Sequence, residues 1–521
     1  MTEVAAPRRW YRPGVADILF LLAALAVIRG AQHGLLDDPG LGWHLRNIDA
    51  MRAVGGWLTV DPFTDPRGGP PPAWLSNQWL GELPFYAGWK WAGLEGIAAV
   101  NALIIALLAS CLYRSLLRDG LPWPMALLWA ALGLMGTSCS WNARPNLFTL
   151  LFTFLTADVC VRLSAGKVSR AWSLLLLPLF AVWANAHGGF LAGLIVLGGT
   201  LAAEVATGLL AADADGRAAA RQRAAWTGGL VAGCVLATLV NPYGVGLYRW
   251  VFLLLGDPYF MDLHQEWLPP DFRSAGAIRY EILILLFPLV LGASARRPGL
   301  VELALAIGWL HLALTGFRYV ALWVVVAVPI MARSSMAIAF LRTTAARFGL
   351  NAEPGSLFFT PPGRVPWVWS LVCAVGVLGL AKTQEGRFAR HGQQMIASHA
   401  LDELITMAGE WQKRTHRRPV IFHGYDWGGY LTWHGWSELL NWIDDRNEVQ
   451  GRARIEDYFA TLRADGGWEE RLARVDFVCI APATPLARRL HDDNGWRERY
   501  RDEYAVIYER SAQGPARPIE R

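Results

Sequence analysis

Charged residues are scarce in this chain. They make up 17% of its 521 residues, whereas a soluble globular protein carries about 25%. They are also unevenly distributed, because residues 382–521 hold 21 of the 48 Lys and Arg and 22 of the 43 Asp and Glu. This scarcity excludes an enzyme that is solvated by water throughout. The distribution indicates a membrane domain, residues 1–382, followed by a soluble domain, residues 383–521.

Motifs typical of several other protein classes are missing as well. The six cysteines show neither zinc-ligand spacing nor a disulfide framework. There is no internal repeat, no dinucleotide-binding fingerprint and no Gly-Lys-Ser phosphate loop. The net charge of +5 comes from the membrane part, and no basic stripe with interleaved aromatic residues accompanies it. We therefore expect no nucleic-acid partner.

What the sequence does contain is long hydrophobic runs. A membrane-spanning helix needs roughly 20 mainly apolar residues. Eleven segments approach that length: Val15–Leu36, Leu94–Leu117, Pro122–Ser138, Leu147–Leu163, Ala171–Ala186, Gly189–Leu210, Trp226–Val240, Tyr280–Ala293, Gly299–Thr315, Tyr319–Met331 and Pro366–Lys382. We therefore predict a mainly α, polytopic membrane protein with about eleven transmembrane helices. The first segment is too long for a removable signal peptide and lacks a small-residue cleavage site.

The charge of the connecting loops predicts the orientation. Lys and Arg concentrate on the cytoplasmic side of membrane proteins. Taking the N-terminus as cytoplasmic, every second loop should be basic, and all five such loops are, through Arg114 and Arg118; Arg162, Lys167 and Arg170; Arg217, Arg221 and Arg223; Arg296 and Arg297; and Arg333, Arg342, Arg347 and Arg364. An odd number of spans then places residues 383–521 outside the cytoplasm.

Two of the outer loops are long, residues 37–93 and 241–279. They are rich in Trp, Pro, Asp, Glu and His, and loops of this length are usually functional or disordered. Their aromatic content argues against disorder. We therefore expect the protein to act on its outer face.

The soluble part alternates short apolar runs with mixed segments. We predict strands at Pro419–His423, Asp476–Ala481 and Tyr504–Glu509. We predict helices at Ser398–Trp411, Arg454–Arg463 and Thr484–His491. The pattern indicates a small α/β domain packed on the membrane domain.

Asp37 and Asp38 directly follow the first span, at the outer surface of the membrane. Partial desolvation there would raise the pKa of a carboxyl group and suit it to accept a proton from a hydroxyl. The alternative interpretation is an ordinary acidic cap where the chain meets water.

Arg144 and Arg318 lie at outer turns that lead into hydrophobic segments. Each could extend to lipid headgroups or grip a phosphate with its planar guanidinium. Together they indicate a lipid-phosphate site. His187, at the turn between two spans, is either structural or part of that site.

A divalent metal is a further hypothesis, with no cofactor as the alternative. Asp37, Asp38, His264 and Glu266 could ligate a metal, although a two-residue spacing within a loop is weak evidence. In the soluble part, the glycine-rich turn with Tyr425, Asp426 and Trp427 could contact an acceptor, dock the domain or simply be packed.

Several of these motifs resemble a known superfamily. The chain is similar to bacterial multi-pass proteins related to the GT-C glycosyltransferases, which include protein mannosyltransferases, lipid A aminoarabinose transferases and oligosaccharyltransferase catalytic subunits. The motifs that carry the resemblance are Asp38–Leu45, Asp61–Thr64, Gln78–Glu82, Arg144-Pro145, Trp183–Phe190, Asn241–Gly244, Glu266-Trp267, Tyr425–Tyr430 and Ala483–Ala487.

The resemblance implies a function and a location. In GT-C enzymes an acidic residue just beyond the first span is the catalytic base, and here that role falls on Asp38 or Asp37. The nearest relatives often read Asp-Pro-Asp at this point, whereas this chain has Gly40 in place of the second Asp. The resemblance implies transfer of a sugar, with inversion, from a polyprenyl-phosphate donor to an extracytoplasmic glycan, lipid or protein, in the inner membrane of the bacterial cell envelope.

The same resemblance suggests which other residues shape the site. The donor phosphate would lie near Arg318 and Arg144. Residues expected to contact the acceptor or shape the site are His44, Glu82, His187, Glu266, Tyr425, Asp426 and Trp427. The alternative is a non-catalytic scaffold or lipid-glycan carrier of the same fold. A transporter is the least favoured, because transporters place polar groups near the middle of the membrane, whereas these lie in outer loops.

Overall fold

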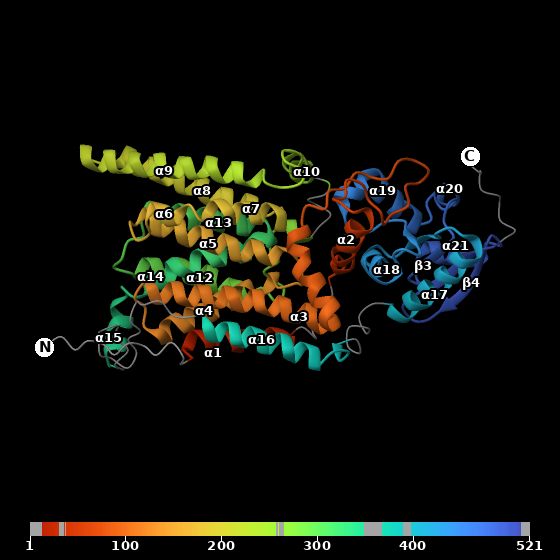
Figure 1. Ribbon diagram of the computed structural model, residues 1–521, viewed down its shortest axis with the longest axis horizontal. Helices are drawn as coiled ribbons and strands as arrows, with labels where there is room; N and C mark the ends of the chain where they lie inside the picture. Colours follow the sequence, from red (N-terminus) through yellow and green to blue (C-terminus); the bar gives the residue numbers. More distant parts are fainter. Residues whose placement is uncertain are drawn as a thin grey trace.

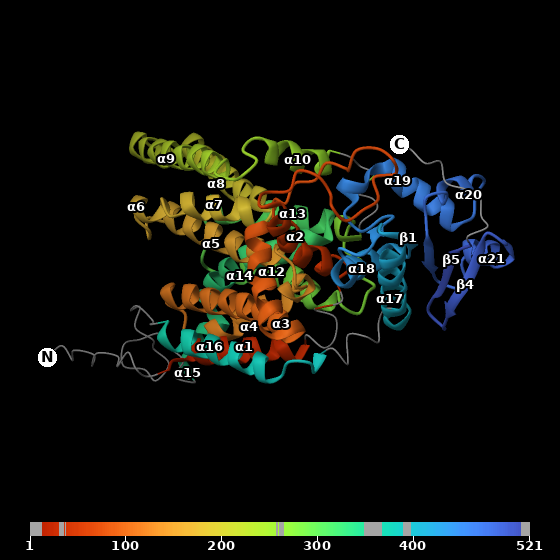
Figure 2. The ribbon, with the colours of Figure 1, turned by 45° about the vertical axis from the view of Figure 1, so that its right-hand side comes forward.

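The computed structural model describes residues 13–30, 36, 38–256, 259, 265–347, 367–388 and 397–511. It consists of a bundle of helices that run roughly parallel to its longest axis and a smaller α/β part at one end of that bundle (Figure 1). The helix α2 (Leu41–Val54) and the short helix α10 (Gly246–Leu255) lie at the junction between the two parts (Figures 1 and 2).

The bundle coincides with the hydrophobic segments. Its helices are α1 (Val15–Gly30), α3 (Trp79–Arg118), α4 (Trp123–Thr137), α5 (Asn146–Ser164), α6 (Arg170–Ser173), α7 (Leu176–Ala186), α8 (Phe190–Leu210), α9 (Ala214–Thr238), α12 (Ile278–Ala293), α13 (Leu300–Thr315), α14 (Val320–Ser335) and α16 (Val368–Thr383). Among the described residues, four helices are long and apolar enough to cross a membrane: Trp79–Arg118, Asn146–Ser164, Phe190–Leu210 and Phe317–Ser335. The mainly helical fold is confirmed, and the number of eleven spans stays a prediction.

Helix α14 lies at the centre of the bundle and packs against α4, α5, α12 and α13. Its Val-rich segment would favour a strand by propensity alone. It is nevertheless helical, because a helix satisfies every backbone hydrogen bond within the segment and an apolar environment offers no other partner. Almost all of its side chains are buried.

The predicted outer loop 37–93 is only partly a loop. It contains α2 (Leu41–Val54) and the first third of α3, which leads through a kink into the predicted span. Ala92 and Gly93 have non-helical backbone angles and kink α3. On either side of the kink, Gly88 and Gly96 touch so closely that a Cβ on Gly96 would lie 1.9 Å from the Gly88 carbonyl oxygen.

The C-terminal part is built on a five-stranded sheet in the order β2-β1-β3-β5-β4. The strands β1 (Val420–His423), β2 (Leu440–Asn441) and β3 (Phe477–Ile480) are parallel, and β4 (Trp496–Arg501) and β5 (Val506–Arg510) are antiparallel. The helices around the sheet are α17 (Ser398–Thr415), α18 (Gly428–Gly435), α19 (Asn447–Leu462), α20 (Trp468–Arg471) and α21 (Pro485–Asp492). A small α/β unit is thus confirmed, with β2, β4, α18 and α20 added to the predicted elements.

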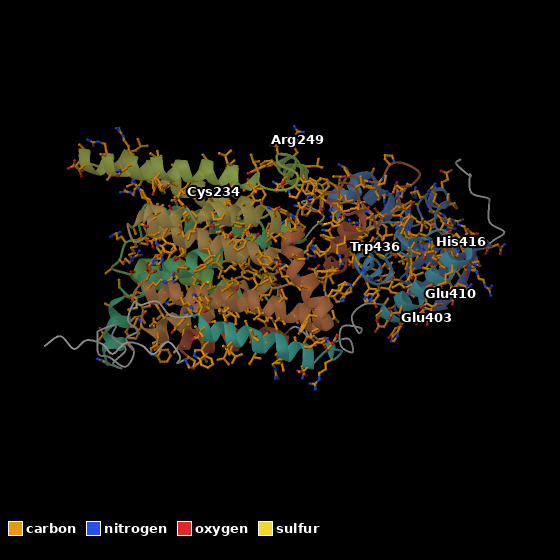
Figure 3. All side chains as sticks on the ribbon, in the orientation of Figure 1. Cys234, Arg249, Glu403, Glu410, His416 and Trp436 are labelled. Carbon is orange, nitrogen blue, oxygen red and sulfur yellow. The ribbon has the colours of Figure 1, made fainter. Side chains whose placement is uncertain are left out.

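The two parts join through the first outer loop. Phe63 and Asp65 exchange backbone hydrogen bonds with Asn441 of β2, at 3.0 and 2.8 Å, so that the loop extends the edge of the sheet. Trp436, labelled in Figure 3, packs edge-on against Phe63 with ring centres 5.7 Å apart. The loop and the C-terminal part therefore form one continuous structural unit.

A buried ion cluster fastens this junction. Arg446, which follows β2, pairs with Asp61 of the outer loop at 2.9 Å and with Asp444 at 2.5 Å. All three side chains are fully buried. The Arg446 guanidinium also lies 4.5 Å from the ring centre of Trp74. Because separating the two parts of the chain would leave these buried charges without their partners, which is strongly destabilising, the cluster favours the docked arrangement.

Helices α2 and α18 complete the contact, and here small residues are required. A Cβ on Gly429 would lie 1.6 Å from the carbonyl oxygen of Pro39, and a Cβ on Gly42 would lie 1.9 Å from that of Gly429. Neither position can carry a side chain without separating the two helices. The glycine-rich turn predicted from the sequence therefore docks the C-terminal part beside Asp38.

Candidate functional site

The outer turns of the bundle meet beside the C-terminal part. Asp38 precedes α2, Arg144 precedes α5, and His187 separates α7 from α8. Glu266 lies in the short helix η3 (Gln265–Trp267) and Arg318 in η4 (Phe317–Tyr319). Five residues predicted separately thus come from five different turns at the same end of the bundle.

Arg144 joins two carboxylates of this group. Its guanidinium pairs with the buried Asp38 and, at 3.3 Å, with Glu266. Asp38 also accepts the backbone N–H of Gly40 at 2.8 Å and the side-chain amide of Asn142 at 3.5 Å. Burial disfavours the charge of Arg144, but Asp38 and Glu266 outweigh this cost and raise its pKa. Arg144 is therefore a permanent cation that holds Asp38 in place.

Arg318 is placed differently. Its guanidinium stacks on the ring of Trp267, 3.9 Å from the ring centre, an arrangement favoured by attraction between a cation and an aromatic face. Within the described part of the chain it forms no ion pair or hydrogen bond. The ring of Trp267 fixes the orientation of the guanidinium, and its N–H groups have no acceptor among the described residues. Arg318 is therefore suited to donate two hydrogen bonds to one phosphate group.

His187 is held as a neutral ring. The backbone N–H of Gly189 donates to its Nδ1 at 3.0 Å. Burial, reinforced by the charges of Arg318 and Arg144, lowers its pKa to about 3. Thr149, which accepts a hydrogen bond from Trp183 at 2.9 Å, lies 2.8 Å from the same Nδ1. The proton of the neutral imidazole therefore resides on Nε2, which is available as a donor.

The structure adds a carboxylate that the sequence analysis did not single out. Asp445, from the loop after β2, accepts the indole N–H of Trp43 at 3.0 Å. A Cβ on Gly40 would lie 3.1 Å from Asp445 Oδ2 and 3.2 Å from Asp38 Oδ1. The two carboxylates thus face each other across Gly40. A side chain at position 40 would crowd both.

Asp445 is also electrostatically unusual. Burial and the negative charge of Asp444 raise its pKa to about 7, with a smaller contribution from Asp38, although Arg144 and Arg446 oppose the rise. A carboxyl group that titrates near neutral pH can both accept and donate a proton there. The sequence signal was Asp444-Asp445-Arg446 directly after an apolar strand, of the same kind as Asp37-Asp38.

His44 and Glu82 lie one layer behind this site. Both are buried, and His44 Nδ1 lies 2.8 Å from Glu82 Oε1. Glu82 also accepts the side-chain amide of Asn47, and the ring of His44 stacks 3.7 Å from that of Trp43. The pair joins α2 to α3 and lies beside the indole that binds Asp445, and its role in shaping the site stays a prediction.

The three residues of the glycine-rich turn separate in the structure. The Tyr425 hydroxyl donates to Asn447, and its ring packs on Tyr458 and Phe459. Asp426 is exposed, and Trp427 packs in the core of the C-terminal part. Only Tyr425 lies near Asp445, whose charge contributes after burial to raising the pKa of the phenol.

The predicted metal ligands are only partly represented. Asp37 and His264 lie outside the described residues, while Asp38 and Glu266 are both described. Within the described ranges, no group of three or more His, Cys, Asp or Glu could hold a metal ion. Arg144 takes the position between Asp38 and Glu266 that a cation would need. The described residues therefore do not fit a divalent metal, and a guanidinium supplies the positive charge.

Comparisons with known proteins extend this description. No family model and no curated protein matches the chain. Among solved structures, the oligosaccharyltransferase AglB from Archaeoglobus fulgidus, in complex with an inhibitory peptide and a dolichol-phosphate, is similar with a TM-score of 0.57 and 13% identity. The match covers 97% of this chain and 75% of that one. The same enzyme in complex with Zn and sulfate gives 0.52 and 13%, over 94% and 73% of the two chains.

A second similar structure is covered almost completely by this chain, unlike AglB, and has the same fold. ArnT from Cupriavidus metallidurans, in the apo state, is similar with a TM-score of 0.52 and 16% identity, over 96% of this chain and 99% of that one. AglB and ArnT are both members of the superfamily that the sequence motifs resemble. The likeness covers the helical bundle and the C-terminal part together, and it confirms that this chain has the GT-C fold.

Proposed function

We propose that this protein is a membrane glycosyltransferase that transfers a sugar from a polyprenyl-phosphate-linked donor to an extracytoplasmic glycan, lipid or protein. The observation that carries the proposal is the meeting of an unpaired, oriented Arg318 with the facing carboxylates Asp38 and Asp445. A phosphate grip and a proton acceptor are the two functions that such a transfer needs. The fold of AglB, solved with a dolichol-phosphate, is consistent with this chemistry.

The donor phosphate would bind on the Arg318 side of the site. The guanidinium of Arg318 donates two parallel hydrogen bonds to phosphate oxygens, and Nε2–H of His187 donates a third. Arg144 adds positive charge close to both. Because His187 is neutral, it contributes direction to the grip without adding charge.

The acceptor would bind between Asp38 and Asp445. Asp38 takes the proton from the acceptor hydroxyl as the oxygen attacks the anomeric carbon. The bond from that carbon to the phosphate oxygen breaks on the opposite face, and the lipid phosphate leaves with the bonding electrons. Configuration is therefore inverted. Arg144 keeps the Asp38 carboxylate aimed during this step.

We also propose that the N-terminus is cytoplasmic and the C-terminal part extracytoplasmic, in a bacterial inner membrane. The basic loops at the bundle end away from the C-terminal part support this orientation. A reporter that is active only outside the cytoplasm, fused after Arg521, should be active in cells. A cytoplasm-only reporter at the same position should be silent, and the reverse pattern would overturn the orientation.

Donor binding should depend on the shape of Arg318 as well as on its charge. A lysine offers a point charge where arginine offers a planar fork. We expect Arg318→Lys to weaken binding of a polyprenyl phosphate about tenfold and Arg318→Ala to weaken it further, since a hydrogen bond to a charged group contributes roughly 1.5–3 kcal/mol. Arg273→Ala, in an exposed outer loop, is the control. Equal affinities in all variants, measured by titration in detergent, would remove Arg318 from the site.

Activity should also rise as Asp445 loses its proton. Above a pH of about 7 Asp445 is ionised and adds a second negative charge beside the acceptor hydroxyl, and below that pH this charge is lost. We therefore expect kcat/KM for the acceptor to increase through pH 7, and Asp445→Asn to abolish that increase while donor affinity is kept. A pH profile that is the same in Asp445→Asn and the unchanged protein would contradict this role.

A further inference from the structure

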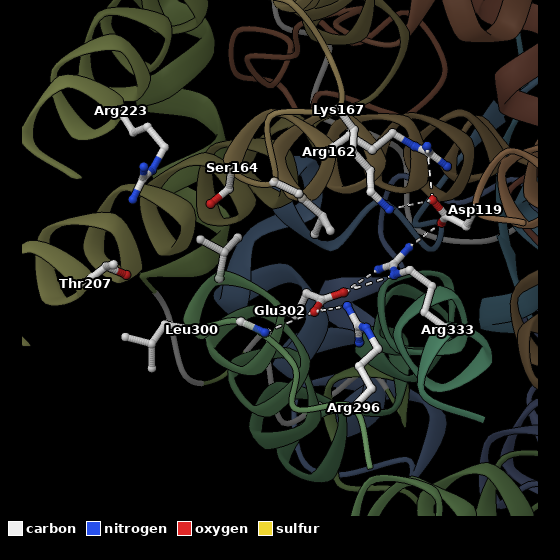
Figure 4. Close-up of a pocket in the computed structure, with 14 residues that line it drawn as sticks. Asp119, Arg162, Ser164, Lys167, Thr207, Arg223, Arg296, Leu300, Glu302 and Arg333 are labelled. Carbon is white, nitrogen blue, oxygen red and sulfur yellow. Dashed lines mark hydrogen bonds and ion pairs between the residues drawn. The ribbon is translucent and has the colours of Figure 1, made fainter. Parts of the chain in front are cut away.

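A second charged cavity lies far from the candidate site. It has a volume of about 280 Å³ and opens among α5, α8, α9, α13 and α14 (Figure 4). Five cationic side chains line it: Arg162, Lys167, Arg223, Arg296 and Arg333. Two carboxylates, Asp119 and Glu302, lie among them.

This cavity and the candidate site are at opposite ends of the bundle. Helix α13 begins at the cavity and ends beside η4, which carries Arg318. Its 16 residues span about 24 Å at 1.5 Å per residue. Helix α5 makes the same connection from Arg144 to Arg162, and its 19 residues span about 28 Å. This separation is close to the roughly 30 Å of a bilayer hydrocarbon core, so the cavity lies at the other headgroup level.

Asp119 is shared by three cations. Arg333 lies 3.0 Å from it, Arg162 3.2 Å and Lys167 3.5 Å. The carboxylate is almost completely buried, and Arg162 and Arg333 are at least nine-tenths buried. One negative charge therefore holds three positive ones together at the wall of the cavity.

Glu302 also holds cations together at the wall of the cavity. It pairs with Arg296 at 2.6 Å and with Arg333 at 2.9 Å. It also accepts the backbone N–H of Gly299, the residue that precedes α13. The start of a helix carries partial positive charge, which adds to the positive potential of the cavity.

Arg223, on α9, extends toward the cavity from the opposite wall (Figure 4). Its Nε is buried and has no hydrogen-bond partner among the described residues. Glu204, which accepts a hydrogen bond from Thr227 at 2.7 Å, interacts electrostatically with Arg223. A buried guanidinium N–H without an acceptor is costly, and an anion in the cavity would satisfy it.

The charges do not balance within the protein. Behind the lining, Asp158 pairs with Arg162 at 2.9 Å and Glu204 faces Arg223. Even with these two added to Asp119 and Glu302, cations outnumber carboxylates around the cavity. Guanidinium groups held by neighbouring carboxylates are preorganised donors for phosphate oxygens, and basic pockets between membrane helices bind lipid headgroups.

We propose that this cavity is a binding site for a phosphate group, separate from the donor phosphate at the other end of the bundle. The phosphate is supplied by an anionic lipid headgroup of that membrane face or by free phosphate in solution. The inference does not rest on the proposed glycosyltransferase activity, because no residue is shared between the two sites.

The test compares two matched variants on the same helix. Arg223→Gln removes the unsatisfied guanidinium, and Arg221→Gln removes an exposed one two residues earlier that does not line the cavity. The full chain is purified in detergent, stripped of lipid and titrated with phosphatidylglycerol, phosphatidylcholine or inorganic phosphate. Binding is followed by native mass spectrometry for the lipids and by calorimetry for phosphate.

We expect Arg223→Gln to bind its ligand about tenfold more weakly and Arg221→Gln to bind like the unchanged protein. A loss seen with phosphatidylglycerol identifies a lipid headgroup, and a loss seen only with inorganic phosphate identifies a soluble ligand. Lys167→Gln, at a half-exposed side chain, provides a second variant in case Arg223→Gln does not fold. No selective loss for any ligand, or equal loss in Arg223→Gln and Arg221→Gln, would overturn the proposal.

Discussion

Turnover is expected to fall about 10²–10⁴-fold when Asp38 is replaced by Asn, because that is the usual contribution of a general base. The amide keeps the size of the carboxylate and its hydrogen bond from Gly40, but it cannot accept the acceptor proton. Donor affinity should change little, since the phosphate grip lies with Arg318. The measurement is the rate of sugar transfer together with polyprenyl-phosphate binding, on the same purified protein.

Asp492→Asn is the control for this experiment. Asp492 is an exposed acid at the end of α21, so its neutralisation should leave both quantities unchanged. Asp37→Asn is expected to cost less than Asp38→Asn, and the opposite order would exchange the roles of the two neighbours. Undiminished transfer in both single variants and in the double variant would contradict the mechanism. A scaffold or lipid-glycan carrier of the same fold would then be the better interpretation.

The largest loss of stability is expected from Arg446→Ala. This change leaves Asp61 and Asp444 buried without their counter-ion, and removing one partner of a buried ion pair typically costs about 3–5 kcal/mol. We expect the free energy of unfolding of the C-terminal part to fall by that order. The loss can be followed in detergent by denaturant titration and by proteolysis at the junction.

Two further variants make this result specific. Arg463→Ala removes an arginine of a largely exposed pair with Asp465, and exposed pairs contribute only about 0–1 kcal/mol. The triple change Asp61→Asn, Arg446→Met and Asp444→Asn should be less destabilised than Arg446→Ala alone, because no unpaired charge remains. Similar unfolding of Arg446→Ala and Arg463→Ala would show that the buried cluster does not hold the junction.

Much of the fold could be predicted because the sequence patterns that specify its helices and strands lie within single segments. A hydrophobic run of sufficient length forms a helix wherever it lies in a membrane bundle, and each predicted segment contains a helix. The strands β1, β3 and β5 were found for the same reason, since they are short and mostly apolar. The edge strand β4 was missed, because four of its six residues are exposed and its sequence reads as polar.

Outer loop 37–93 shows where local reasoning fails. Its aromatic and polar residues indicated an ordered loop, whereas α2 and the first third of α3 are helical. The main packing partner of α2, helix α18, comes from the other end of the chain. Gly42 gives no local sign that it must leave room for the Gly429 carbonyl oxygen. Only the contact between α2 and α18 explains why this segment is a helix and why position 42 is a glycine.

The sequence by itself determined the hydrophobic bundle, the small α/β part and the chemical types at the site: a carboxylate after the first span and arginines at the outer turns. Tertiary structure alone decided that Arg144 pairs with Asp38 and Glu266, that Arg318 stacks on Trp267, and that Asp445 faces Asp38. The physical reason is the distance along the sequence over which each feature is specified. A hydrophobic pattern can be recognised within a single segment. Trp43 and Asp445 are 402 residues apart in sequence and share a hydrogen bond only after both parts have folded and docked.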